Sequence, residues 1–155
     1  MDYIAQLIER YPVLASVKNE IRTAYQVLER AYTNHKKLLV GGNGGSCADA
    51  EHIVGELMKG FVKKREIPKM MQERLLGLDQ ELGKQLANGL QSSLRAIAIT
   101  GHAGLSTAFA NDVDPEMTYA QQVNGYGDEG DVLLAISTSG NSKNLIYAAL
   151  TARAK

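Results

Sequence analysis

The sequence has little of several features that point to particular classes of protein. Its single cysteine, Cys47, allows no internal disulfide and no zinc-type cysteine pairing, which fits a reducing compartment. Basic and acidic residues number 17 each, so no excess charge favours nucleic acid or an anionic membrane. No apolar run has membrane-spanning length, and the N-terminus lacks a signal-peptide core. We expect a cytoplasmic protein with a small-molecule partner, and neither nucleic acid nor membrane.

The length and composition favour a single domain. A chain of 155 residues with 45% hydrophobic residues is long enough for one substantial core. Apolar residues recur at helical spacing over 2–35, where Pro12 predicts a break between two helices. We therefore expect one domain over 1–155, with a helical lead-in at 1–36 and an α/β core at 37–155.

Strand and helix patterns alternate through this predicted core. Short apolar runs typical of buried strands lie at 38–40, 95–100 and 131–136. Helical patterns follow them at 48–58, 104–110 and 143–154. Between the first helix and the second strand, residues 61–91 favour helix and loop over sheet, with glycines that interrupt a single long helix. The alternation predicts a parallel sheet covered by helices on both faces, a three-layer αβα sandwich.

Two loops repeat one design, in which glycines and small hydroxyl residues join a strand to a helix. The first is 41–46, with Asn43, Gly44, Gly45 and Ser46; the second is 137–142, with Ser137, Thr138, Ser139 and Ser142. Ligands of open α/β sheets bind at the carboxyl ends of the strands, and helix N-termini attract anions. The loops therefore predict a phosphate site. Ordinary turns and helix caps are the alternative for either loop alone.

Neither loop has a nucleotide-binding spacing. No Gly-Lys-Ser/Thr follows the glycines, so the first loop is not a phosphate loop of the Walker type. The dinucleotide spacing Gly-x-Gly-x-x-Gly is also missing from both loops. We therefore expect no nucleotide cofactor.

His52 and Glu56 follow the first loop and lie four residues apart, on one face of the predicted helix. A carboxylate and an imidazole suit the proton transfers of aldose-ketose isomerisation, and the same pair is able to ligate a metal. A surface histidine paired with a glutamate one turn away is the structural alternative. Spacing alone favours this structural alternative, and closeness to the loop, less than three turns, shifts the weight toward the functional interpretation.

Other polar residues have ordinary explanations beside functional ones. Asp112, next to Asn111, is an acceptor suited to sugar hydroxyls, or part of a helix-ending turn. The basic cluster 63–65 is in reach of a phosphate, although a solvated charged patch is the favoured interpretation. Cys47 stands at a helix N-terminus without an evident base, and we interpret it as a packed small residue.

Two stretches resemble the SIS (sugar isomerase) domain family, and within it the phosphoheptose isomerases. They are GGNGGSCADAEHIVGEL at 41–57 and GDVLLAISTSGNS at 130–142. The resemblance extends over the chain except for the segment near 61–91. It implies a flavodoxin-like fold with a five-stranded parallel sheet, and a homotetramer with sites between subunits.

The resemblance also implies roles for individual residues. Phosphate binding is implied for five hydroxyl residues: Ser46, Ser137, Thr138, Ser139 and Ser142. Asn43 and Asp112 are implied to lie near the sugar, and Glu56 matches the family's catalytic base. His52 matches a residue that joins this glutamate in binding zinc in some members, so zinc is the one cofactor implied.

Two departures from the family pattern leave alternatives open. Family members carry a second catalytic histidine and a glutamine on a C-terminal helix, whereas this chain has no histidine after His102. We expect the last strands of the sheet to be missing with it. The basic residue that often follows the catalytic glutamate by four positions is Gly60 here, next to Lys59.

The leading hypothesis is isomerisation of sedoheptulose 7-phosphate. The alternatives are a non-catalytic phosphosugar-binding or protein-docking module, and an isomerase for another sugar phosphate.

Overall fold

A computed structural model describes residues 2–155 of the chain. The elements, in chain order, are α1 (Tyr3–Arg10), the 3-10 helix η1 (Pro12–Val17), α2 (Lys18–Thr33), β1 (Leu38–Gly42), α3 (Gly45–Met58), α4 (Lys69–Leu78), α5 (Gln80–Gly89), β2 (Ala96–Ala98), α6 (Ala103–Asp112), the 3-10 helix η2 (Pro115–Met117), α7 (Thr118–Tyr126), β3 (Val132–Ile136) and α8 (Lys143–Ala154). None of the helices in the described range has the length and apolar character needed to cross a membrane.

The sheet is parallel, with strand order β2-β1-β3. Leu38 pairs with Ala96 on one side and with Val132 on the other, so β1 is the central strand and is buried throughout. The three predicted strands are confirmed. Residues 2–155 form three strands, whereas the family resemblance implied five. β3 therefore lies at an edge, where Leu134 is 37% exposed.

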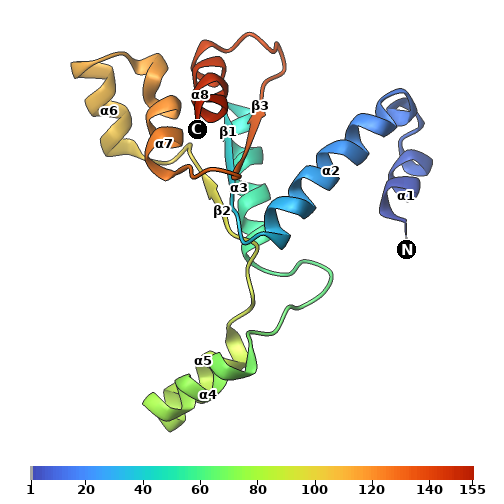
Figure 1. Ribbon diagram of the computed structural model, residues 1–155, viewed down its shortest axis with the longest axis vertical. Helices are drawn as coiled ribbons and strands as arrows, with labels where there is room; N and C mark the ends of the chain where they lie inside the picture. Colours follow the sequence, from blue (N-terminus) through green and yellow to red (C-terminus); the bar gives the residue numbers. More distant parts are fainter. Residues whose placement is uncertain (1) are drawn as a thin grey trace.

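Helices cover both faces of this sheet, which confirms the three-layer αβα architecture (Figure 1). On one face, Leu38 and Val40 pack with Ala50 of α3 and with apolar residues of α2. On the other face, Leu39 and Ile99 pack with α7 and α8. The alternation of side chains along a strand sends neighbouring residues of β1 to opposite layers. Because both layers are buried, the strands must be apolar at nearly every position, and the sequence has this pattern.

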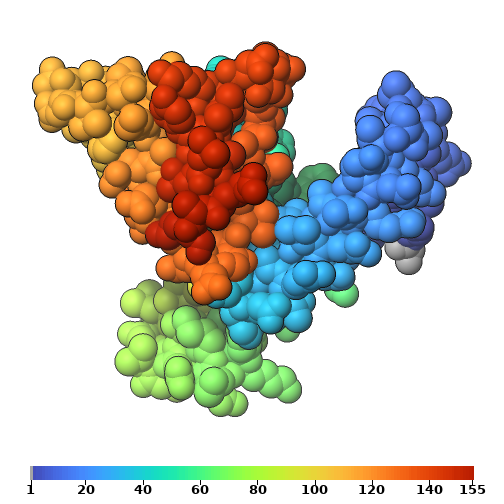
Figure 2. Space-filling view, turned by 45° about the horizontal axis from the view of Figure 1, so that its top comes forward, coloured from blue at the N-terminus to red at the C-terminus, as the bar shows by residue number. Residues whose placement is uncertain are grey.

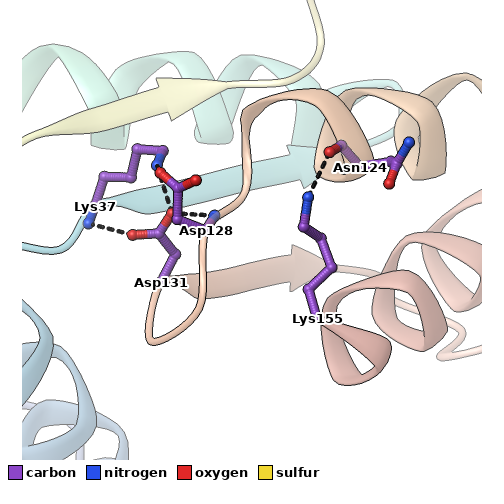
Figure 3. A network of polar contacts seen from close by, with 5 residues as sticks. All are labelled: Lys37, Asn124, Asp128, Asp131 and Lys155. Atoms are coloured by element: carbon purple, nitrogen blue, oxygen red, sulfur yellow. Dashed lines mark hydrogen bonds and ion pairs between the residues drawn. The ribbon is translucent and has the colours of Figure 1, made fainter.

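An ion-pair network fixes the beginning of β1 against the beginning of β3 (Figure 3). Asp131 pairs with the Lys37 ammonium and accepts hydrogen bonds from the backbone N–H groups of Lys37 at 2.9 Å and Asp128 at 2.8 Å. Burial raises the pKa of the Asp131 carboxyl, but these hydrogen bonds and the Lys37 charge outweigh it and lower that pKa overall. The network holds the register of the two strands at the edge away from the loops.

Two helical parts project from the sheet and its covering helices (Figures 1 and 2). One consists of α1, η1 and α2, where Pro12 begins a 3-10 helix and ends the first helix as predicted. The other is a hairpin of α4 and α5, in the segment for which helix and loop were predicted. Its turn is set by Asp79, whose side chain accepts from the N–H groups of Glu81 and Leu82 and so caps α5.

Candidate functional site

The first loop turns tightly from β1 into α3. Gly44 has φ +55°, a left-handed conformation that favours glycine, and the N–H of Ser46 bonds the carbonyl of Asn43. A Cβ added at Gly42 would lie 2.4 Å from the Ser46 carbonyl oxygen, so the loop closes against the helix. The prediction that this helix begins at Ala48 was wrong. It begins at Gly45, because the glycine turn completes itself within four residues, and Gly45 and Ser46 form its first turn.

The second loop uses its own hydroxyls to set its shape. The hydroxyls of Ser137 and Ser142 lie 3.1 Å apart, and the N–H of Gly140 donates to Ser137 Oγ at 3.1 Å. The N–H of Asn141 donates to Ser139 Oγ at 3.2 Å. Thr138 lies exposed among them. The loop is thus a ring of hydroxyl and amide groups that leads into the N-terminus of α8, an arrangement suited to anion oxygens.

The structure brings these two loops together. They follow adjacent strands, since Gly42 pairs with Ile136 at the last position of the ladder. Asn43 of the first loop and Asn144 of α8 exchange a pair of side-chain hydrogen bonds of 3.0 and 2.9 Å. The two predicted loops therefore form one surface at the carboxyl edge of the sheet, as the sequence indicated.

Charged side chains flank this surface. Lys143 follows the second loop directly, and its pKa is raised by a hydrogen bond with Tyr147 and by the nearby charges of Asp114 and Glu116. Its ammonium therefore keeps its charge beside the loop. Asp112 ends α6 and is exposed, and its carboxylate accepts from Asn111 Nδ2 at 2.6 Å. The segment that follows it, η2, packs on α8, which brings this acidic turn to the same side of the molecule.

Glu56 lies in the last turns of α3 and is only partly exposed. Its Oε1 is 3.1 Å from Lys59 Nζ and 4.0 Å from His52 Nε2, while His52 itself is largely exposed. Glu56 Oε2 is buried without a hydrogen-bond partner among the described residues. A buried carboxylate oxygen without a partner is costly, so this atom is available to a substrate or another ligand. Lys59 thus supplies a basic group beside the Glu56 carboxylate, in place of the basic residue that the family pattern has at the position of Gly60.

The structure does not bring Glu56 to the loops of its own chain. Ser46 and Glu56 are ten residues apart on one helix, which is about 15 Å along its axis. The N–H of Leu94, just before β2, donates to the carbonyl of Leu57, so this end of α3 lies at the amino edge of the sheet. The separation is less than three turns, as the sequence indicated, but a straight helix carries its last turns to the opposite edge of the sheet.

Three residues at the loop edge were not singled out from the sequence. Asn144 ties the loops together, and Tyr119 donates from its hydroxyl to the Gly42 carbonyl at 2.7 Å. Burial raises the pKa of the Tyr119 hydroxyl, with a smaller effect from Cys47, so it remains a donor. Glu51 accepts from Thr100 Oγ1 at 3.0 Å. Only Asn144 had a signal in the sequence, as a second amide just beyond the hydroxyl loop.

Two side chains in the last turns of α3, His52 and Glu56, are candidate metal ligands. His52 and Glu56 lie one helical turn apart, and no group of three or more His, Cys, Asp or Glu within residues 2–155 is arranged to hold a metal ion. Catalytic zinc sites use three protein ligands plus a water or substrate. One chain, as described, supplies two of them.

Known proteins with similar sequences are phosphoheptose isomerases. The chain is 34% identical to that of Aromatoleum aromaticum over 99% of its own length and 68% of the relative's. It is 36% identical to that of Geotalea uraniireducens over 96% and 67%, and 35% identical to that of Nitratiruptor sp. over 92% and 65%. Across the relatives compared, the chain spans 51 to 68% of their length. No protein-family model matches the chain.

Solved structures give the same result for the fold. The phosphoheptose isomerase of Neisseria gonorrhoeae superimposes with a TM-score of 0.66 at 29% identity, over 98% of this chain and 62% of that one. That of Francisella tularensis gives 0.65 at 26% identity, over 99% and 71%. From the sequence identity to relatives of which it covers two thirds or more, and from this shared fold, the chain belongs to the phosphoheptose isomerase family.

Proposed function

We propose that this protein isomerises sedoheptulose 7-phosphate to D-glycero-D-manno-heptose 7-phosphate. The observation that carries the proposal is the meeting of two glycine and hydroxyl loops at the carboxyl ends of adjacent strands, tied by Asn43 and Asn144. Family membership supports this reaction, since the relatives are named phosphoheptose isomerases. The small-molecule partner is then a phosphorylated sugar. The single cysteine supports a cytoplasmic location.

The phosphate binds between the two loops. Its oxygens accept from backbone amides of Gly44 and Gly45 and from the hydroxyl residues Ser46, Ser137, Thr138, Ser139 and Ser142. Two helix N-termini, those of α3 and α8, point at this surface and favour a dianion. Asn43 and Asp112 contact the sugar hydroxyls. Fixing the phosphate in this way holds the carbonyl end of the sugar in register for reaction.

Glu56 acts as the base. Its carboxylate takes a proton from the carbon next to the carbonyl, which gives an enediol, and returns it to the former carbonyl carbon. A second group must move the proton between the two oxygens, and the neighbouring His52 imidazole suits this role. Lys59 Nζ, 3.1 Å from Oε1, forms an ion pair with this carboxylate before the reaction.

We infer that the active site is shared between subunits of a homotetramer. Within one chain, Glu56 and the loops lie at opposite ends of α3, about 15 Å apart along the helix. Reacting atoms must come within about 3–3.5 Å, which a neighbouring copy achieves by placing its Glu56 at these loops. The family resemblance supports four subunits.

Zinc is a further proposal for the same site. His52 and Glu56 would hold it, and the unpartnered Glu56 Oε2 is an available donor. A zinc ion held there would polarise the substrate carbonyl. The third protein ligand would have to come from another chain. The proton transfers above do not depend on the metal.

The experiment that tests the function is Glu56→Gln, which keeps the shape of the side chain and removes the base. We expect turnover of sedoheptulose 7-phosphate, followed by NMR, to fall at least about 100-fold, the lower range for general base catalysis. Binding of the sugar phosphate, followed by calorimetry, stays unchanged. Unchanged turnover overturns the catalytic role. Binding without turnover in the unaltered protein favours a non-catalytic module, and turnover of other sugar phosphates alone changes the substrate.

A mixing experiment tests the shared site. A Glu56→Gln chain and a Ser139→Ala chain are each expected to be weakly active. If the site is shared, unfolding and refolding them together restores part of the activity, because some sites combine an intact loop with an intact Glu56. If each chain contains its own site, the mixture shows only the average of the two.

A further inference from the structure

The α4–α5 hairpin is a separate structural part that the proposed reaction does not use. It stands away from the sheet and from the α1–α2 projection (Figure 1). Its two helices pack closely on each other at Gly83, where an added Cβ would lie 2.1 Å from the Leu75 carbonyl oxygen. Neither helix packs extensively on another described element. The hairpin therefore has one side against itself and the others free.

Hydrogen bonds hold the base of this hairpin firmly. The Arg65 guanidinium donates to the carbonyls of Ser92 at 2.8 Å and Leu57 at 2.7 Å. Ser93 Oγ donates to the Met58 carbonyl, and Gln91 Oε1 accepts from the Gly60 N–H. The basic cluster at 63–65 thus includes a structural arginine. These contacts join the two chain segments at the base of the hairpin to each other and to the end of α3.

The free side of the hairpin is apolar. On α5, Leu82 and Leu86 are 59% and 46% exposed, and Leu90 continues the row one turn later at 42%. On α4, Met71 and Leu78 are 43% and 85% exposed. With about 100° of rotation per residue and antiparallel helices that meet at Gly83, both rows fall on the same side. We call the surface formed by these five residues the hairpin face.

Such a face is not expected to remain in water. Helices of ten residues are marginal alone, and their stability comes from packing of an apolar side. The chain exposes 10647 Å² in total. A folded monomer of 16.8 kDa exposes about 7,700 Å². The excess of roughly 3,000 Å² is shared by the α1–α2 projection, the sheet edge and the hairpin. About a quarter of it on the hairpin would equal the approximately 800 Å² that each partner contributes to a standard interface.

The charge of the hairpin indicates what covers the face. It carries three basic and three acidic side chains: Lys69, Arg74, Lys84, Glu73, Asp79 and Glu81. With no net charge, the hairpin favours neither an acidic nor a basic partner, and a neutral, self-complementary surface suits a two-fold contact. We propose that the hairpin face packs on the hairpin face of a second copy of this chain, forming a four-helix contact. This contact is independent of the proposed reaction.

The first test compares two variants with the same change in charge. Leu82→Glu with Leu86→Glu places two carboxylates in the hairpin face. Gln80→Glu with Lys84→Gln makes the same change on the other side of α5. By light scattering after gel filtration, we expect the first variant to have half the mass of the unaltered protein, and the second to keep the full mass. Equal masses for all three, or a monomeric unaltered protein, would overturn the proposal.

A crosslinking test covers the case in which the glutamates unfold the hairpin instead of separating two copies. Cys47→Ser removes the native thiol, after which Leu86→Cys or Lys84→Cys provides a single reactive site. A short bis-maleimide is expected to join two copies through position 86 and not through position 84. Crosslinking at neither position, or equally at both, contradicts face-to-face packing. Circular dichroism of the same samples confirms that the helices remain.

Discussion

Replacing Asp131 by asparagine is expected to destabilise the protein strongly without touching the loops. The side chain is 6% exposed and serves three donors: the Lys37 ammonium and two backbone N–H groups. Asparagine keeps the volume, but its single carbonyl oxygen accepts from one of the two N–H groups and turns an NH₂ group toward the other. The variant therefore leaves a buried donor without an acceptor and removes the charge opposite Lys37.

The size of the effect follows from these contacts. Removing one partner of a buried ion pair costs about 3–5 kcal/mol. Lys37 keeps Asp128, whose carboxylate is 2.6 Å from its Nζ, so we expect a smaller loss of about 2–4 kcal/mol in the free energy of unfolding. For a chain of this size that corresponds to a fall in Tm of roughly 5–15 °C. Urea unfolding at one fixed protein concentration measures it, since association also shifts apparent stability.

The stabilisation that Asp131 provides depends on pH, and the direction of this dependence follows from the pKa of its carboxyl. Because the pKa of the Asp131 carboxyl is lowered in the folded protein, its stabilisation is complete above the unfolded value of 3.8 and is lost as pH falls through the folded pKa. The difference in the free energy of unfolding between the unaltered protein and Asp131→Asn should therefore be constant from roughly pH 5 to 8, above the unperturbed pKa. It should shrink toward roughly pH 3. Asp128→Asn, at an exposed carboxylate, is the matched control and should cost much less. Equal losses for both variants would refute the reasoning.

Three other predictions concern the site. Gly42→Ala places a Cβ 2.4 Å from the Ser46 carbonyl oxygen and should weaken sugar-phosphate binding in calorimetry by roughly 10- to 100-fold, whereas Gly104→Ala, in α6 with open space at its Cβ, should not. Asn144→Ala removes both hydrogen bonds to Asn43 and should weaken the same binding several-fold, by about 1 kcal/mol, with little change in Tm. His52→Ala should lower the zinc content measured by mass spectrometry after dialysis; unchanged content would exclude His52 as a ligand.

The sequence was sufficient for the features that depend on local patterns. Three apolar runs predicted the strands, and small residues after 38–40 and 131–136 predicted two loops at one edge of the sheet. These succeed because a buried parallel strand must be apolar on both faces. The helix Thr118–Tyr126 was missed, because its buried face includes Thr118 and Gln122, which do not look apolar. Gln122 is buried because its amide donates to the Ile99 carbonyl.

What the sequence did not provide is the distance between parts of the site. His52 and Glu56 were placed correctly on one helix face, but the end of that helix lies at the opposite edge from the loops. Periodicity fixes which residues share a face and leaves open which copy of the chain they serve. The exposure of the hairpin was not predicted for a similar reason. In the sequence, its apolar rows look like those of ordinary core helices.

The most direct measurement of the central claim is turnover of sedoheptulose 7-phosphate by this chain, followed by NMR with and without added zinc. We predict that the heptose 7-phosphate appears and that its rate depends on Glu56. Sugar-phosphate binding without any product would contradict an isomerase and leave a phosphosugar-binding protein.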